Sequence, residues 1–220
     1  MNTNQDDIEF ARLRKEMVER QIVGRGIRNP RVIDAMKTVP RHRFVPVAHA
    51  SRAYGDHPLS IGEGQTISQP YMVAYMIECI QPEPGDVVLE VGAGCGYAVA
   101  VLAQIVQKVY GIEYIPELAA KATRNLQELG YKNFEIGAFD GSKGWPEKSP
   151  FDGILVSAGA PAIPEDLKKQ LVPGGIMVIP TGDRFSQRLE IVEKHGDKIT
   201  VTPDLLCRFV DLRGKEGWGV

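Results

Sequence analysis

The feature that most constrains the fold is an alternation of short apolar runs and helical stretches that begins at Asp86. The run VVLEV (87–91) is short, apolar and bounded by turn residues, as is typical of a strand buried on both faces. It is followed by a glycine-rich loop, by the helical stretch YAVAVLAQIVQ (97–107) and by a second run, KVYGIE (108–113). Strands separated by helices form parallel sheets with right-handed crossovers. We therefore expect an α/β fold built on a doubly wound, mostly parallel sheet.

The alternation continues through the middle of the chain and then changes. Pro116 opens a predicted helix that ends near Gly130, and Gly174-Gly175 leads into a predicted strand, IMVIP. Two β-rich stretches, RLEIVEK (188–194) and KITVTPDLLCRFV (198–210), are expected to form an antiparallel hairpin at one edge of the sheet. The other elements predicted in this region are short strands at 134–136 and 154–157 and a helix that contains 167–171.

The N-terminal third of the chain is predicted to be helical and irregular. Phe10, Leu13 and Met17 recur at helical spacing, which indicates an amphipathic helix. The pair Asn29-Pro30 is a start signal for a second helix, with Asn29 as its cap and Pro30 in its first turn. The other elements predicted here are a loop over 41–67 and a helix from about 68 to 80.

The 220 residues are expected to form one domain. Hydrophobic residues make up 43% and charged residues 25%, which is enough apolar material for a core without a disulfide or a metal ion. We divide the domain into an N-terminal helical extension (1–84), an α/β core that holds the glycine-rich loop (85–182) and a C-terminal β-rich part (183–220).

Composition argues against several classes of function. The net charge is −2 and Lys and Arg are scattered, whereas nucleic-acid-binding proteins usually carry a basic excess or stripe. Cys79, Cys95 and Cys207 lie far apart, and no Cys or His spacing suggests a metal site. The start MNTNQDDIEF is unlike a secretory signal, and the most apolar stretches are about half as long as a membrane span. We expect a cytoplasmic protein that binds neither nucleic acid nor membrane; its oligomeric state stays open, and a monomer is the simplest case.

The loop Glu90-Val91-Gly92-Ala93-Gly94-Cys95-Gly96 follows the first predicted strand, where such sheets bind nucleotide-like ligands. A dinucleotide fingerprint requires G-x-G-x-x-G, but Tyr97 stands at its last position, and the Gly-Lys-Ser/Thr of a P-loop is missing. Instead an acid, Glu90, precedes Gly92, Gly94 and Gly96, which allow the backbone to approach a ligand closely. This arrangement suits a ligand with positive charge and no phosphate. We expect S-adenosylmethionine, which carries an ammonium and a sulfonium group.

Two further acids follow the next two strands. Glu113 ends the second strand, where a carboxylate can accept both ribose hydroxyls. Asp140 precedes Gly141 after the third strand, where it could accept from the adenine amino group. The alternatives are that the glycines only make a turn and that Asp140-Gly141 is an ordinary turn dipeptide.

A narrower resemblance lies in the segment GQTISQPYMV (64–73), which resembles the signature of protein-L-isoaspartate O-methyltransferases, a family of class I S-adenosylmethionine-dependent methyltransferases. Asp211 stands where that family commonly has Pro, and Phe139 where Gly often precedes the Asp. These departures concern loop shape. The other segments that resemble the family, in order, are VPRHRFVP (39–46), LEVGAGCGY (89–97), FDGSKGWPEKSPFDGILVSAGA (139–160), LVPGGIMVIPTG (171–182) and CRFVDLRGKEGW (207–218).

The resemblance implies a Rossmann-like methyltransferase fold, with the helical extension on the substrate side, and a repair activity. The methyl group goes to the free α-carboxylate of an L-isoaspartyl residue in a damaged protein or peptide, leaving S-adenosylhomocysteine, and the ester collapses to a succinimide. That carboxylate, with a pKa of about 3.5, is already ionised at neutral pH, so no general base is needed. By this resemblance Ser68 orients the carboxylate as the catalytic residue. The substrate-binding residues it implies are Thr66, Ile67, Ser68, Arg208, Phe209 and Val210.

Three alternatives stay open. Ser68 precedes a predicted helix, and serine is a favoured N-cap, so its role could be structural. The acceptor could be a small molecule or a nucleic acid; enzymes that methylate exocyclic amines tend to carry Asp/Asn-Pro-Pro-aromatic after the fourth strand, whereas this chain has Ser157-Ala158-Gly159-Ala160-Pro161. A non-catalytic module that binds S-adenosylmethionine is the third.

Overall fold

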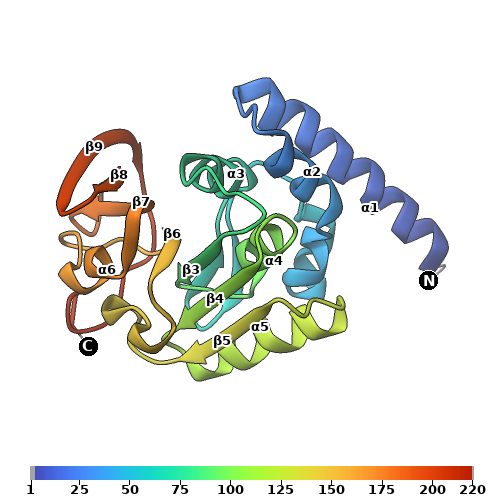
Figure 1. The fold of residues 1–220 in the computed structure, drawn as a ribbon. Coiled ribbons are helices and arrows are strands. Elements are labelled where there is room, and N and C mark those ends of the chain that lie inside the picture. The colour runs from blue at the N-terminus through green and yellow to red at the C-terminus, as the bar shows by residue number, and fades with distance from the viewer. Residues whose placement is uncertain (1–2, 220) are drawn as a thin grey trace.

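The computed structural model describes residues 3–219. Their main sheet has seven strands, and helices lie on its faces (Figure 1). The strand order is β5-β4-β3-β6-β7-β8-β9. Pairing is parallel from β5 to β7 and antiparallel from β7 to β9, so the expected α/β fold with antiparallel C-terminal strands is confirmed. The strands are β3 (Val87–Val91), β4 (Lys108–Glu113), β5 (Phe134–Ala138), β6 (Phe151–Val156), β7 (Leu171–Gly182), β8 (Gln187–His195) and β9 (Lys198–Cys207).

The strand order creates a crevice beside the first strand of the sheet, β3. The chain runs outward from β3 to β4 and β5, then returns to place β6 on the other side of β3. Such a reversal leaves room beyond the carboxyl ends of the two strands, and ligands bind there in open α/β sheets. The crevice lies beyond Val91 at the end of β3 and Val156 at the end of β6, which are paired in register.

The sheet separates two apolar cores. The larger core joins β3 and β4 to the helices on one face and includes Met17, Met36 and Leu102. The smaller core lies on the other face, where α6 contributes Leu167 and the C-terminal segment contributes Leu212. The helices are α1 (Thr3–Met17), α2 (Pro30–Thr38), α3 (Pro70–Cys79), α4 (Tyr97–Ala103), α5 (Pro116–Glu128) and α6 (Glu165–Lys169).

The two N-terminal helices form as their residues predict. Helix α1 continues into one turn of π-helix, Val18–Ile22, whose Val18 and Ile22 are buried. The Asn29 side chain accepts from Arg31 N at 3.0 Å and caps α2, and Pro30 occupies its first position. None of the helices in the described part of the chain has the length and apolar character that crossing a bilayer requires.

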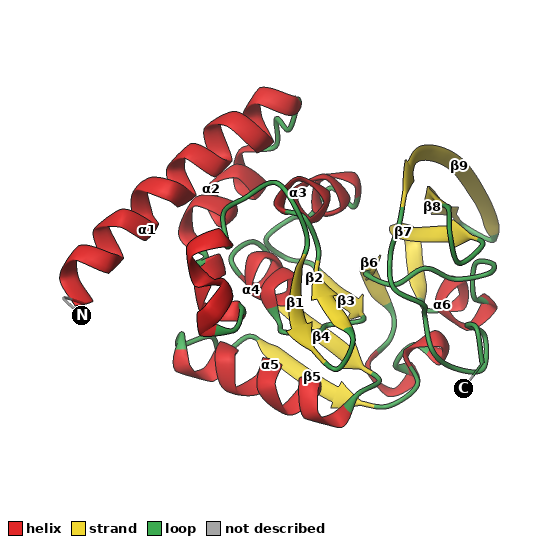
Figure 2. Cartoon of the chain, turned by 180° about the vertical axis from the view of Figure 1, so that it is seen from behind, coloured by secondary structure: helices red, strands yellow, loops and turns green. Residues whose placement is uncertain are grey.

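Some element boundaries differ from the prediction. Segment 41–67 holds two short 3-10 helices and a hairpin of β1 (Leu59–Gly62) and β2 (Gln65–Ile67). Strands of three or four residues are too short to show an alternating pattern, so the sequence does not reveal them. The predicted helix at 167–171 ends earlier, because Leu171 already pairs with Phe151 as the start of β7. The hairpin, labelled in Figure 2, lies against the loop after β3 and against α5: a Cβ at Gly94 would lie 3.2 Å from Ile61 Cδ1, and Lys121 Nζ donates to the carbonyl of Ile61 at 3.1 Å.

Candidate active site

The glycine loop between β3 and α4 requires glycine for its backbone shape. Gly92, Gly94 and Gly96 have φ angles of 86°, 55° and 87°, which side chains of L-amino acids rarely adopt. At Gly96 a Cβ atom would also lie 3.3 Å from Ala122 Cβ and Leu126 Cδ1 on α5. The loop therefore approaches α5 closely behind and presents backbone to the crevice in front.

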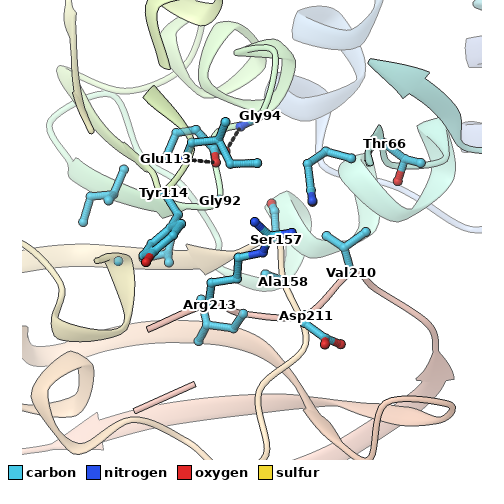
Figure 3. A pocket seen from close by; sticks show the side chains of 16 residues that line it. Thr66, Gly92, Gly94, Glu113, Tyr114, Ser157, Ala158, Val210, Asp211 and Arg213 are labelled. Atoms are coloured by element: carbon cyan, nitrogen blue, oxygen red, sulfur yellow. Dashed lines mark hydrogen bonds between the residues drawn. The ribbon is translucent and has the colours of Figure 1, made fainter. Parts of the chain in front are cut away.

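Glu113, at the end of β4, holds this loop in place. One of its carboxylate oxygens accepts from Gly94 N at 2.8 Å and the other accepts from Ile115 N at 2.9 Å (Figure 3). The side chain is almost fully buried and lines the crevice. Each carboxylate oxygen can accept a second hydrogen bond, so Glu113 can receive hydroxyl donors while it fixes the loop.

Glu90 is the second-last residue of β3, just before the glycines, and is buried with one unpartnered carboxylate oxygen. Its Oε1 accepts from Ser157 Oγ at 3.1 Å, and its Oε2 has no hydrogen-bond partner among the described residues. Burial raises the pKa of the Glu90 carboxyl to about 8. A buried carboxyl with an unpartnered oxygen is costly alone and becomes favourable beside a cation. This is the feature of the site that fits a positively charged ligand.

Three adjoining spaces surround these residues, and Thr66 and Ser157 line all three. We call them the strand-end cavity, the inner cavity and the outer groove. The strand-end cavity lies beyond the carboxyl ends of β3 and β4, where Val91, Ile112 and Glu113 line it. Its lining includes Gly92, Gly94, Glu113, Tyr114, Gly141 and Arg213. The inner cavity is lined by Thr66, Ile67, Ser68, Glu90, Gly94 and Tyr97, among others. The outer groove is lined by Ser68, Met72, Arg184, Arg208, Phe209 and Val210, among others.

A protein-family model described as protein-L-isoaspartate(D-aspartate) O-methyltransferase matches residues 12–217. The chain belongs to this family. It is 49% identical over 211 residues to protein-L-isoaspartate O-methyltransferase 1 of Syntrophobacter fumaroxidans, covering 96% of this chain and 99% of that one. It is 53% identical over 214 residues to the protein-L-isoaspartate O-methyltransferase of Pelotomaculum thermopropionicum, covering 97% of this chain and 93% of that one.

Solved structures of the family share the fold. One, a protein-L-isoaspartate O-methyltransferase, superposes with a TM-score of 0.81 at 28% identity and covers 90% of this chain, which spans 65% of that longer chain. A Plasmodium falciparum protein described as a beta-aspartate methyltransferase superposes with a TM-score of 0.77 at 26% identity, covering 90% of this chain and 97% of that one. That protein was solved in complex with S-adenosyl-L-homocysteine.

Ser68 lines both the inner cavity and the outer groove. The alternative that Ser68 is the N-cap of α3 is wrong, because Gln69 occupies that position and the helix begins at Pro70. The backbone carbonyl of Ser68 accepts from Arg41 Nη2 at 2.7 Å. Ser68 therefore lines the crevice without capping α3.

Asp140 and Gly141, at the end of β5, lie differently from each other. Asp140 Oδ1 accepts from Ser142 N at 3.0 Å and from its hydroxyl at 2.7 Å, and Oδ2 accepts from Lys215 N at 2.8 Å. Its carboxylate thus ties the C-terminal segment to β5, and the adenine contact of Asp140 stays a prediction. Gly141 lines the strand-end cavity, and a Cβ there would lie 2.7 Å from Val91 Cγ1.

Sequence reasoning missed two residues that complete the site. Ser157 follows β6 directly and joins all three spaces; its place at the carboxyl end of the strand beside β3 is a signal that could have identified it. Arg213 reaches the strand-end cavity from the C-terminal segment (Figure 3). Arg213 lies after the last strand, β9, so no sequence pattern could have placed it at this cavity.

Proposed function

We propose that this protein transfers a methyl group from S-adenosylmethionine to the free α-carboxylate of L-isoaspartyl residues in damaged proteins and peptides. The ester that forms collapses to a succinimide, which starts repair. One observation carries the proposal. The acids at the ends of β3 and β4 and the hydroxyl-bearing Ser68 surround adjoining spaces that meet at Ser157. Family membership supports the same activity.

The strand ends fit the cofactor. S-adenosylmethionine, when bound, supplies an electrophilic methyl group on a positively charged sulfur. Glu113 would accept the ribose hydroxyls, and the bare Oε2 of Glu90 would face positive charge. Gly92 and Gly94 let the backbone approach the ligand, Gly96 fixes the loop against α5, and Gly141 leaves space at the adenine end. The product S-adenosylhomocysteine would occupy the same place.

The acceptor enters from the outer groove. Ser68 donates its hydroxyl to the substrate carboxylate as the catalytic residue. Thr66 and Ile67 shape the pocket, and the backbone of 208–210 binds the peptide. Bound S-adenosylmethionine would supply the methyl group to the carboxylate oxygen that Ser68 holds, with the carbon–sulfur bond as the bond broken, and no proton would move. Catalysis then consists of holding the reacting atoms in line and away from water.

The proposed activity determines the expected partners and location of the protein. We expect isoaspartyl proteins and peptides as substrates, no nucleic acid and no membrane, and a cytoplasmic location. The net charge of −2 supports this choice, since it gives the chain no electrostatic preference for phosphate backbones. We also propose a single domain over 1–220, supported by the larger core, which runs without a break from Met17 in the helical extension to Leu189 in β8.

A paired methylation assay tests the proposed function. The protein is incubated with methyl-labelled S-adenosylmethionine and either an isoaspartyl peptide or its aspartyl twin. We expect base-labile methyl on the isoaspartyl peptide alone. Binding of S-adenosylhomocysteine without transfer to either peptide would instead support a non-catalytic module, and transfer to a nucleic acid or a small molecule would support a different acceptor.

A further inference from the structure

Arg41 is a fully buried cation without an acidic partner. It opens the 3-10 helix Arg41–Phe44 and has 0% of its surface exposed. Its Nε donates to the carbonyl of Ala53 at 2.8 Å, and its Nη2 donates to the carbonyl of Ser68 at 2.7 Å. Its Nη1 has no hydrogen-bond partner among the described residues. None of the ion pairs found in residues 3–219 includes this guanidinium.

Such burial is unfavourable for stability alone. Arginine stays charged in proteins, and a buried charge without a counter-ion usually costs more than its hydrogen bonds return. Two carbonyl acceptors and the ring of Tyr97, 4.9 Å from the guanidinium carbon, offset part of this cost. These contacts leave Arg41 Nη1 without a hydrogen-bond partner among the described residues.

The Arg41 guanidinium contacts two residues that line the inner cavity. Ser68, whose carbonyl Arg41 holds, lines that cavity, and so does Tyr97, over whose ring Arg41 lies. Glu90, with its own unpartnered oxygen, lines the same cavity. The cavity thus has a buried carboxyl at the β3 end and a buried cation behind Ser68.

We propose that Arg41 is a positioning residue for the acceptor: it fixes Ser68 through the Ser68 carbonyl and attracts an anionic carboxylate to that residue. The inference rests on the proposed function, because it assumes a carboxylate acceptor. Methyl transfer turns that carboxylate into a neutral ester, so attraction to a positive charge weakens as the reaction proceeds. An interaction that is no stronger in the transition state favours binding and does not speed the chemical step. Arg41 should therefore act on KM more than on kcat.

Matched ligands and variants test the proposal. The protein is loaded with S-adenosylhomocysteine, and binding is measured for an isoaspartyl peptide and for its analogue with a neutral α-amide. Arg41→Met should weaken binding of the acid about tenfold or more and of the amide less than twofold, with kcat changed less than threefold. Arg41→Lys should retain most of the affinity. Arg43→Met is the control, because Arg43 lies in the same short helix but is largely exposed, 3.9 Å from Glu128.

Two results would overturn the proposal. Equal losses for the acid and the amide would make Arg41 a purely structural residue. Weaker binding of S-adenosylhomocysteine by Arg41→Met, with peptide preference intact, would mean that the cation serves the methionine carboxylate of the cofactor. Neither result touches the proposed function, which fails only if the wild-type protein transfers no methyl to the isoaspartyl peptide.

A second measurement needs no variant. The α-carboxylate of the isoaspartyl peptide is labelled with ¹³C and titrated by NMR, free and bound to the wild-type protein loaded with S-adenosylhomocysteine. A nearby cation favours the ionised form, so the pKa of the bound carboxylate should lie below that of the free peptide. An equal or higher pKa in the complex would contradict the proposal even if Arg41→Met does not fold.

Discussion

The cofactor side and the acceptor side of the crevice are built in different ways. On the cofactor side, Gly94 lies in the loop after β3 and Glu113 ends the neighbouring strand β4, and Gly94 N donates to the Glu113 carboxylate. On the acceptor side, Ser68 and Val210 come from segments far apart in the chain, and both line the outer groove. In the first arrangement the parallel sheet itself brings the carboxyl ends of β3 and β4 together, whereas the second depends on the segments that flank the sheet.

The two sides also differ in charge. Three buried side-chain atoms of the described residues lack a hydrogen-bond partner, namely Gln21 Oε1, Arg41 Nη1 and Glu90 Oε2. Gln21 lies elsewhere, but Glu90 lines the inner cavity and Arg41 bonds to a residue that lines it. The unpartnered carboxylate oxygen of Glu90 matches a cationic methyl donor. The unpartnered Nη1 of Arg41, which holds Ser68, matches an anionic acceptor. The difference predicts that the two sides can be weakened separately.

The largest effect is expected on the cofactor side. Glu113→Ala removes the acceptor for Gly94 N and Ile115 N, two charge-assisted hydrogen bonds that shape the loop. We expect a loss of about 3 kcal/mol, so that S-adenosylhomocysteine binds roughly 100-fold more weakly in calorimetry. Glu113→Gln should lose less, since it keeps one acceptor oxygen. A change below about threefold would show that the strand-end cavity is not the cofactor site.

A smaller effect is expected on the acceptor side. Ser68→Ala should lower kcat/KM for an isoaspartyl peptide about tenfold to thirtyfold, because a hydrogen bond to a charged group is lost. The melting temperature should fall by less than about 2 °C, since Ser68 does not cap α3. The control is Ser60→Ala, on an exposed position of β1. Full activity together with a loss of several degrees would make Ser68 structural only.

The Glu90 carboxyl predicts a pH dependence confined to the cofactor side. Its pKa is raised to about 8 by burial, so it is mostly protonated at pH 6, and binding a cation releases that proton. Affinity for S-adenosylmethionine should rise from pH 6 to pH 7.5, by at most about tenfold per pH unit. Glu90→Gln should remove this rise. An equal pH dependence in both proteins, measured by calorimetry, would place the titrating group elsewhere.

The smallest effect is expected for a variant that lowers stability and leaves binding on both sides of the crevice unchanged. Asn29→Ala removes the side-chain acceptor for Arg31 N at the start of α2. We expect a loss of about 1 kcal/mol, or roughly 2–4 °C in melting temperature. Binding of cofactor and peptide should stay the same. A selective loss of peptide affinity would show that α2 itself positions the acceptor.

The sequence predicts the two sides unequally. The glycine loop and Glu113 follow from strand ends, because their spacing is local and parallel strands bring their carboxyl ends together. The acceptor side does not follow from spacing: Ser68 is indicated only by resemblance, and its carbonyl is held by Arg41 from a separate segment. Burial of an arginine without an acid cannot be read from a pattern, since charged residues are normally exposed.

The most direct test is a crystal structure of the protein with S-adenosylhomocysteine and an isoaspartyl peptide. We predict the nucleoside at the ends of β3 and β4, against Glu113, and the peptide α-carboxylate within hydrogen-bond distance of the Ser68 hydroxyl. A peptide carboxylate bound away from Ser68, or a cofactor bound away from the glycine loop, would contradict the account.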